Sequence, residues 1–220
     1  GVSILHQVTA YGGKHGPPPV QQMITQSAGF KPASARQVRE EVLKDVLATA
    51  NVSTLAELRK LPSDRLITAN NIIAHQVSQG GFGPAIDGDF VPQEVSQLLL
   101  SGRFSNIRAL IGTNAHEGIL FGDPRINTTS AYADYIQTIV RGITDASSEY
   151  IQHTLYPPIF DGSQGYTNNY ERAYLTFQEL GFTCNQRFTS KGLNGTTNNY
   201  QFAVSPGIHS QDLGFTFYRG

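Results

Sequence analysis

The sequence has no tryptophan, one methionine and a single cysteine, Cys184. One cysteine cannot form a disulfide within the chain, so we expect a buried thiol in preference to a cysteine that has lost its partner. No apolar run approaches the ~20 residues that a membrane-spanning helix requires, and the N-terminus has no charged segment before an apolar stretch. The sequence therefore indicates a protein without a transmembrane segment, and a signal peptide removed earlier is compatible with it.

An excess of charge of either sign is also lacking, because 16 Lys and Arg residues face 17 Asp and Glu residues. Such a protein has no positive field to attract nucleic acids or anionic lipids, which excludes nucleic acid as an expected partner. The six histidines are scattered without the spacing of metal ligands. Gly80-Gly81-Phe82-Gly83 is not flanked by a clear strand and a dinucleotide-type helix. We therefore expect neither a metal nor a cofactor.

Helical and strand-like segments alternate along the chain, which predicts a mixed α/β fold without internal repeats. Short strands are expected at 21–26, 107–111 and 200–204, and the second reads as a buried strand of a parallel sheet. Helices begin at two capping boxes, Ser34 with Gln37 and Thr54 with Glu57. The helices are predicted at 34–47, 54–61, 63–73, 92–102, 132–140, 151–155 and 169–189.

Two of the expected strands lead into Gly- or Pro-containing loops that carry an ionisable residue. Glu117 lies in segment 112–118 and His209 follows Ser205-Pro206-Gly207. Ligands of open α/β sheets bind beyond the carboxyl ends of the strands, where both loops would lie. A carboxylate that orients an imidazole, and an imidazole that accepts a hydroxyl proton, are the supporting roles of acyl transfer. On residue types alone, a solvated glutamate and a structural histidine remain the ordinary alternatives.

Segments spread over nearly the whole chain resemble, in the same order, conserved segments of fungal type B carboxylesterases and lipases. They are Ser3 to Gly13, Gln26-Ser27, Pro84-x-x-Asp87-Gly88 within 82–92, Gly112-Thr113-Asn114 with Glu117-Gly118 and Phe121, and His209 with Gln211 and Asp212. The resemblance implies a partial α/β-hydrolase fold, with mostly parallel strands and flanking helices. Residues 1–220 would then form one domain region, the central to C-terminal portion of that fold.

The same resemblance implies a Ser-His-Glu triad, with Glu117 as the acid and His209 as the general base and acid. An imidazole suits this task because its ordinary pKa of ~6.5 lies near operating pH. The acid precedes the histidine in the chain order of α/β hydrolases. The nucleophilic serine would lie three residues before Gly1, and Ser27 matches a serine that orients the acid.

Ser27 also lies in Thr25-Gln26-Ser27-Ala28-Gly29, which mimics the Gly-x-Ser-x-Gly nucleophile elbow. The elbow requires a close backbone approach that glycine permits, whereas Thr25 has a branched β-carbon. Phe30-Lys31-Pro32 follows, and proline disfavours helical geometry in the residue before it. We therefore expect Ser27 to orient the acid and not to attack the substrate.

The expected function is hydrolysis of small-molecule or lipid carboxylic esters, by a protein completed by a missing N-terminal segment of the same fold. Without the serine this chain alone is expected to be nearly inactive. The alternatives are an inactive fragment and a cholinesterase-like binding domain without catalytic activity. The presence of both Glu117 and His209 favours the enzyme, because a binding surface has no need of that pair.

Three N-glycosylation patterns occur in polar, turn-like contexts, at Asn51-Val-Ser53, Asn127-Thr-Thr129 and Asn194-Gly-Thr196. Such acceptors lie in surface loops of secreted proteins. The sequence therefore favours a secreted glycoprotein.

Overall fold

A computed structural model describes residues 1–16, 18, 20–29, 36–76, 82–140, 142–194 and 197–218. The expected helix start at Ser34, the turn at Phe30-Lys31-Pro32 and the glycines Gly80 and Gly81 lie outside the described residues. None of the helices within these ranges combines the length and apolar character needed to cross a bilayer.

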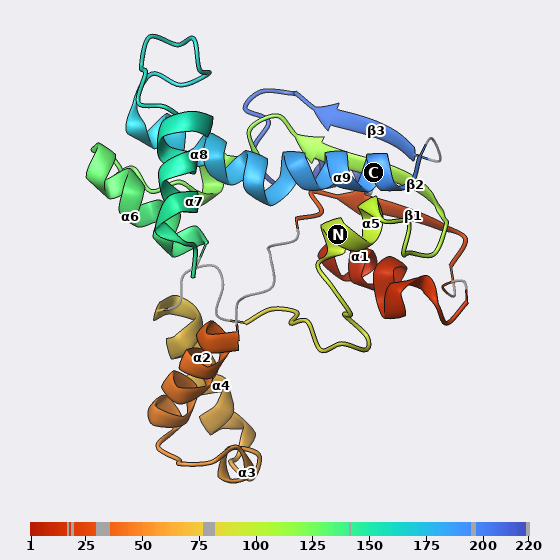
Figure 1. Cartoon of the computed structure of the whole chain (residues 1–220), viewed down its shortest axis with the longest axis vertical. Helices are drawn as coiled ribbons and strands as arrows, with labels where there is room; N and C mark the ends of the chain where they lie inside the picture. The colour runs from red at the N-terminus through yellow and green to blue at the C-terminus, as the bar shows by residue number, and fades with distance from the viewer. Residues whose placement is uncertain are drawn as a thin grey trace.

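The centre of the fold is a parallel sheet of β1 (Gln22–Gln26), β2 (Arg108–Asn114) and β3 (Thr197–Phe202), in the order β1-β2-β3. Figure 1 shows the strands running side by side although they are far apart in the sequence. The predicted parallel α/β architecture is confirmed. The strand boundaries differ: β2 continues past Ile111 to Asn114, and β3 begins at Thr197, before Tyr200, and ends at Phe202, before Val204.

Three helices cover one face of this sheet, α1 (Val2–Thr9), α5 (Val95–Leu100) and α9 (Cys184–Gly192) (Figure 1). A short 3-10 turn, η1 (Ala10–Gly13), follows α1. The core under these helices contains Leu5, Val8, Met23, Val95, Leu99, Ala109, Ile111 and Leu193. On the opposite face, Ile24 is 58% exposed and Leu110 is 37% exposed. The strand at 107–111 was expected to be buried on both faces. The described residues cover only one face of the sheet, so buried and exposed side chains alternate along this segment.

A second helical layer lies beyond the carboxyl ends of the strands (Figure 1). It consists of α6 (Thr129–Ile139), α7 (Asp145–Tyr150) with the π-helical turn η3 (Ile151–Leu155), and α8 (Asn169–Gln178). Its core is formed by Ile126, Tyr132, Ile136, Ile139, Ala173, Phe177 and Phe182. The fully buried Arg172 guanidinium lies 3.6 Å from the centre of the Tyr132 ring and donates to backbone carbonyls of Gln152 and Tyr156. These contacts compensate the burial of its charge.

The helix predicted at 169–189 forms as one continuous rod with an irregularity in its middle. α8 passes through the π-helical turn η4 (Glu179–Thr183) directly into α9. A π turn inserts one extra residue into a helix and changes which side chains share a face. Within the rod, α9 contacts strand β2 of the sheet. The α8 part contacts η2, in the loop that follows β2.

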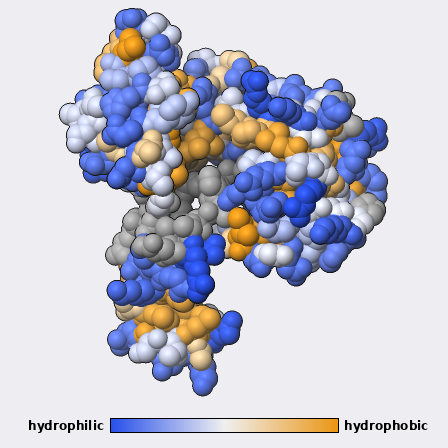
Figure 2. Space-filling view, in the orientation of Figure 1, coloured by the Kyte–Doolittle hydropathy of each residue, from blue (hydrophilic) through white to orange (hydrophobic). Residues whose placement is uncertain are grey.

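A helical hairpin stands apart from the sheet, formed by α2 (Arg36–Ala50), α3 (Leu55–Leu58) and α4 (Ser63–Gln76) (Figure 1). The predicted capping box is confirmed, because Thr54 accepts from the Glu57 N–H and the Glu57 carboxylate accepts from the Thr54 N–H. Figure 2 shows hydrophobic surface on this hairpin, and its exposed apolar residues are Leu55, Ile67 and Ile72. Some apolar side chains of the hairpin are therefore not covered by contacts between its own helices.

The 3-10 turn η2 (Glu117–Phe121) packs directly on the backbone of α8 at Gly118. A Cβ added at Gly118 would lie 1.9 Å from the Tyr174 carbonyl oxygen and 2.7 Å from its carbonyl carbon. Backbone atoms of a helix cannot give way as a flexible side chain does. Gly118 is therefore the residue that permits this close approach.

We expect Gly118→Ala to lower the free energy of unfolding of the full-length protein by about 3 kcal/mol, at the upper end for overpacking. Urea denaturation followed by circular dichroism measures this change. Gly83→Ala is the matched control, because an added Cβ there meets nothing within 4 Å. Equal unfolding midpoints for the two variants would contradict the close packing of η2 on α8.

Candidate active site

The loops that follow the three strands converge at one edge of the sheet. Ser27 directly follows β1, Glu117 lies in η2 after β2, and His209 lies in the loop after β3. Because the strands are parallel, their carboxyl ends lie at the same edge. The structure thus brings together the three residues that the sequence analysis singled out.

Backbone pairing continues beyond the strand ends and holds these loops. The Ser27 N–H donates to the Gly112 carbonyl at 2.8 Å. His116 and Ile208 form a parallel bridge, in which the His116 N–H donates to the Gly207 carbonyl at 2.8 Å. Gly207 has a φ of 66°, a left-handed conformation that glycine adopts without strain, where the chain turns toward His209.

The Glu117 carboxylate and the His209 imidazole form a close pair, with 2.5 Å between Oε2 of Glu117 and Nδ1 of His209. The Glu117 side chain is fully buried, whereas the His209 side chain is 25% exposed. A carboxylate only accepts hydrogen bonds, so Nδ1 carries the proton and donates it. Nε2 of His209 makes no hydrogen bond to any part of the chain that the structure describes. It is therefore available to accept a hydrogen bond from another group.

The second oxygen of the Glu117 carboxylate accepts its two shortest hydrogen bonds from Ser27 and from the Asn114 backbone. Oε1 of Glu117 accepts from the Ser27 hydroxyl at 2.6 Å and from the Asn114 N–H at 2.6 Å. Hydrogen bonds to an ionised carboxylate are strong and offset the cost of burying its charge. Ser27 therefore lies against the acid, on the oxygen that does not face His209. Within the described residues, the Ser27 hydroxyl makes no hydrogen bond to the imidazole.

Aromatic rings line the outer side of the imidazole. The Phe121 ring centre lies 5.1 Å from that of His209 in an edge-to-face arrangement, and the Phe182 ring centre lies 5.0 Å away. Phe121 belongs to η2 and Phe182 to the π turn η4. These rings restrict rotation of the imidazole and provide apolar surroundings in which its hydrogen bond to Glu117 is strengthened.

A polar network beneath the pair was not anticipated. The buried Asp212 carboxylate accepts from the Tyr200 hydroxyl at 2.7 Å and from the Gln26 side-chain amide at 3.0 Å. Burial is the main cause that raises the pKa of Tyr200, and the hydrogen bond to Asp212 raises it further, so the hydroxyl remains a donor at neutral pH. Asn114 and Asp212 belong to segments that resemble the family, but the sequence predicted no role for either residue. No local pattern distinguishes them from exposed polar residues.

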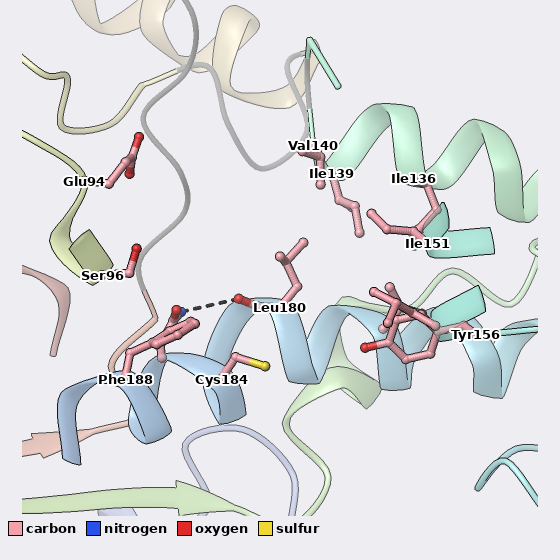
Figure 3. Close-up of a pocket in the computed structure, with 13 residues that line it drawn as sticks. Glu94, Ser96, Ile136, Ile139, Val140, Ile151, Tyr156, Leu180, Cys184 and Phe188 are labelled. Carbon is pink, nitrogen blue, oxygen red and sulfur yellow. Dashed lines mark hydrogen bonds between the residues drawn. The ribbon is translucent and has the colours of Figure 1, made fainter. Parts of the chain in front are cut away.

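An apolar cavity of about 340 Å³ lies between α6, η3 and the α8–α9 rod (Figure 3). The side chains of Ile136, Ile139, Val140 and Ile151 line it opposite Leu180 (Figure 3). Neither Glu117 nor His209 lines this cavity. Its lining residues on the rod include Thr176, Leu180, Cys184 and Phe188, which recur every four residues and so share one helix face. The cavity is thus separate from the acid–histidine pair.

The expectation of a buried thiol is wrong, because Cys184 is exposed and lines this cavity. Its apolar neighbour Phe182 is buried, but it points from a different side of the rod, toward His209. The π turn between α8 and α9 decides which side chain faces inward, and no sequence pattern revealed that turn.

Asn51, Asn127 and Asn194 are all exposed. Two residues of the third glycosylation pattern, Gly195 and Thr196, lie outside the described ranges. Within the described ranges, no three His, Cys, Asp or Glu side chains gather in a way that suits a metal ion.

A parallel sheet with flanking helices, whose strand ends bring a carboxylate and then a histidine to one edge, is the arrangement of an α/β hydrolase. Comparison with known proteins then specifies the family. The sequence model described as "Carboxylesterase family" matches residues 10–205, and the chain belongs to that family.

The related proteins are fungal carboxylesterases and lipases. The chain is 34% identical over 224 residues to carboxylesterase patB of Penicillium expansum, and the match covers 100% of this chain and 40% of that protein. It is 25% identical to a secreted lipase of Arthroderma benhamiae, with 99% of this chain and 42% of that protein covered. The chain thus spans about 40% of the length of the curated relatives that it matches.

Solved esterase structures share the fold. The EstA structure of Aspergillus niger has a TM-score of 0.79 and 18% sequence identity, and the match covers 99% of this chain and 46% of that chain. A PNB esterase has a TM-score of 0.70 and 19% identity, with 98% and 46% covered. At these identities the likeness establishes the α/β-hydrolase fold.

Proposed function

We propose that the protein is a carboxylic ester hydrolase that uses a Ser-His-Glu triad, with Glu117 as the acid and His209 as the base. The observation that supports this most strongly is the 2.5 Å pair of Glu117 Oε2 and His209 Nδ1, which leaves Nε2 facing away from the acid. An imidazole held in this tautomer is ready to accept a hydroxyl proton at Nε2.

In the proposed reaction, Nε2 of His209 removes the proton of a serine hydroxyl as the serine oxygen bonds to the acyl carbon of the ester. The alcohol leaves with the proton from Nε2, and an acyl-serine remains. Water then loses a proton to Nε2 as its oxygen bonds to the acyl carbon, the bond between the acyl carbon and the serine oxygen breaks, and the serine oxygen takes the proton back from Nε2, which releases the carboxylic acid and restores the serine hydroxyl. Glu117 stabilises the imidazolium of both steps through its hydrogen bond to Nδ1.

We propose that the nucleophilic serine is supplied upstream of Gly1, and that residues 1–220 form the central to C-terminal portion of the domain. The start of α1 supports this, because Gly1 lies against Ala28: an added Cβ there would be 2.6 Å from the Ala28 Cα. Ala28 directly follows Ser27, which contacts the acid. A residue shortly before α1 would therefore approach the edge that carries Glu117 and His209. The 220 residues alone are expected to hydrolyse esters hardly at all.

Substrate class and location are proposed from the relatives and the surface. We infer carboxylic esters, of small molecules or lipids, because the related proteins are named carboxylesterases and lipases. We also infer secretion with N-glycosylation, which the name of the Arthroderma benhamiae relative and the exposure of Asn51, Asn127 and Asn194 support.

A fluorophosphonate probe, which reacts covalently with activated serines, tests this function on the full-length protein. We expect one adduct, located by peptide mass spectrometry on a serine upstream of Gly1, together with loss of turnover of a short-chain p-nitrophenyl ester. Ser27→Ala should still be labelled, because Ser27 contacts the acid and not the imidazole. An adduct on Ser27 would refute the assigned nucleophile. A full-length protein with neither labelling nor turnover would favour the non-catalytic binding domain.

A further inference from the structure

A second buried carboxylate lies beneath the acid–histidine pair. Asp212 is 2% exposed and lies three positions after His209, at the start of α10 (Leu213–Thr216). The proposed reaction uses only one carboxylate, that of Glu117. A buried aspartate requires either a cation or several hydrogen-bond donors to compensate its charge.

Neutral donors from all three strands surround this carboxylate. Oδ2 of Asp212 accepts from Tyr200 of β3 and from Gln26 of β1, and Oδ1 accepts from the Asn114 side-chain amide of β2 at 3.2 Å. Among the described residues, no lysine, arginine or histidine forms an ion pair with Asp212. The Asp212 carboxylate is therefore stabilised by hydrogen bonds from neutral side chains and, among the described residues, not by an ion pair.

Asn114 connects this carboxylate to the acid. Its amide oxygen accepts from the Asp212 backbone N–H at 3.3 Å, while its NH₂ group donates to Asp212 Oδ1. This two-way contact fixes which end of the amide is the donor. The same NH₂ group reaches the Ser27 hydroxyl at 3.3 Å and Oε1 of Glu117 at 3.4 Å.

We propose that Asp212 is a positioning residue for the Glu117–His209 pair. Its carboxylate fixes the Asn114 amide, which together with Ser27 holds Oε1 of Glu117, so that Oε2 faces Nδ1 of His209. Asp212 also anchors the far end of the short turn that carries His209, through the hydrogen bond from its own N–H to Asn114. The effect of Asp212 on turnover rests on the proposed esterase function, whereas its effect on the position of the imidazole does not.

Asp212→Asn in the full-length protein removes the charge but keeps the shape of the side chain. We expect kcat for a p-nitrophenyl ester to fall ~10–100-fold, the range for misplaced catalytic groups, with KM changed less than about twofold. Thr189→Val is the matched control, because it removes a buried hydroxyl of α9 outside this network.

The proton between Nδ1 of His209 and Glu117 provides a readout that does not need activity. A hydrogen bond of this kind gives a far-downfield proton resonance, which we expect to be weakened in Asp212→Asn and retained in Thr189→Val. If Asp212→Asn does not fold, Asn114→Ala removes the bridging amide and should weaken the same resonance.

The outcomes separate the two proposals. A resonance that is unchanged in Asp212→Asn refutes the positioning role, even if turnover falls. An inactive wild-type protein whose resonance weakens in Asp212→Asn refutes the esterase function and leaves the positioning role supported.

Discussion

Replacing His209 with alanine in the full-length protein is expected to lower kcat/KM for a p-nitrophenyl ester by about 10⁴–10⁶-fold, the range for loss of a triad base. The structure gives the reason: Nδ1 of His209 is fixed at 2.5 Å from the acid, and no other imidazole among the residues that the structure describes pairs with Glu117. Steady-state kinetics with a chromogenic ester measures the loss, and thermal unfolding confirms that the variant is folded.

His153→Ala is the matched control for this experiment. His153 lies in η3, its side chain is 53% exposed and it pairs with Glu149 on the surface, so its removal should leave kcat/KM within about twofold. Turnover of His209→Ala at the rate of this control would show that another group accepts the serine proton.

The second large effect is expected for Glu117→Gln, at about 10³–10⁴-fold in kcat. The Asn114 backbone N–H can only donate, and it lies 2.6 Å from Oε1. A glutamine side chain is therefore expected to place its oxygen there and its NH₂ group toward Nδ1 of His209. The imidazole must then accept at Nδ1 and carry its proton on Nε2, which is the wrong tautomer for a base.

The pH profile and a second glutamate give this test its control. Because the tautomer is wrong at every pH, raising the pH should not restore the activity of Glu117→Gln. Glu57→Gln makes the same chemical change in the exposed capping box of α3 and should leave kcat unaltered. Activity of Glu117→Gln near that of Glu57→Gln would exclude Glu117 as the partner of the base.

The sequence predicted the parts of the site that have a recognisable motif. Glu117, His209 and Ser27 were identified from segments resembling a known family, and the structure places Glu117 in contact with both His209 and Ser27. The helices were predictable because their apolar residues recur at helical spacing, as in α6. The parallel sheet followed from short apolar runs between helices.

The remaining features depend on contacts between distant segments. Asp212 lies next to polar and apolar residues that would suit an exposed turn, and only the ends of β1, β2 and β3 together bury it. The π turn Glu179–Thr183 has no sequence signature, so the exposure of Cys184 was predicted wrongly. Leu110 was expected to be buried on the basis of its apolar neighbours, whereas no described segment covers its face of the sheet.

The pairing of β2 with its two neighbours has a consequence for how the site comes into being. Asn114 is opposite Phe202, and Gly112 is opposite both Gln26 and Tyr200. Slippage of β2 by one residue would turn the Asn114 amide to the other side of the sheet and draw Glu117 away from the imidazole. Acid and base therefore do not pre-exist in any local stretch of chain. They come together only when β1, β2 and β3, which are far apart in the sequence, pair in the native register. The Glu117–His209 pair therefore forms only when the sheet forms.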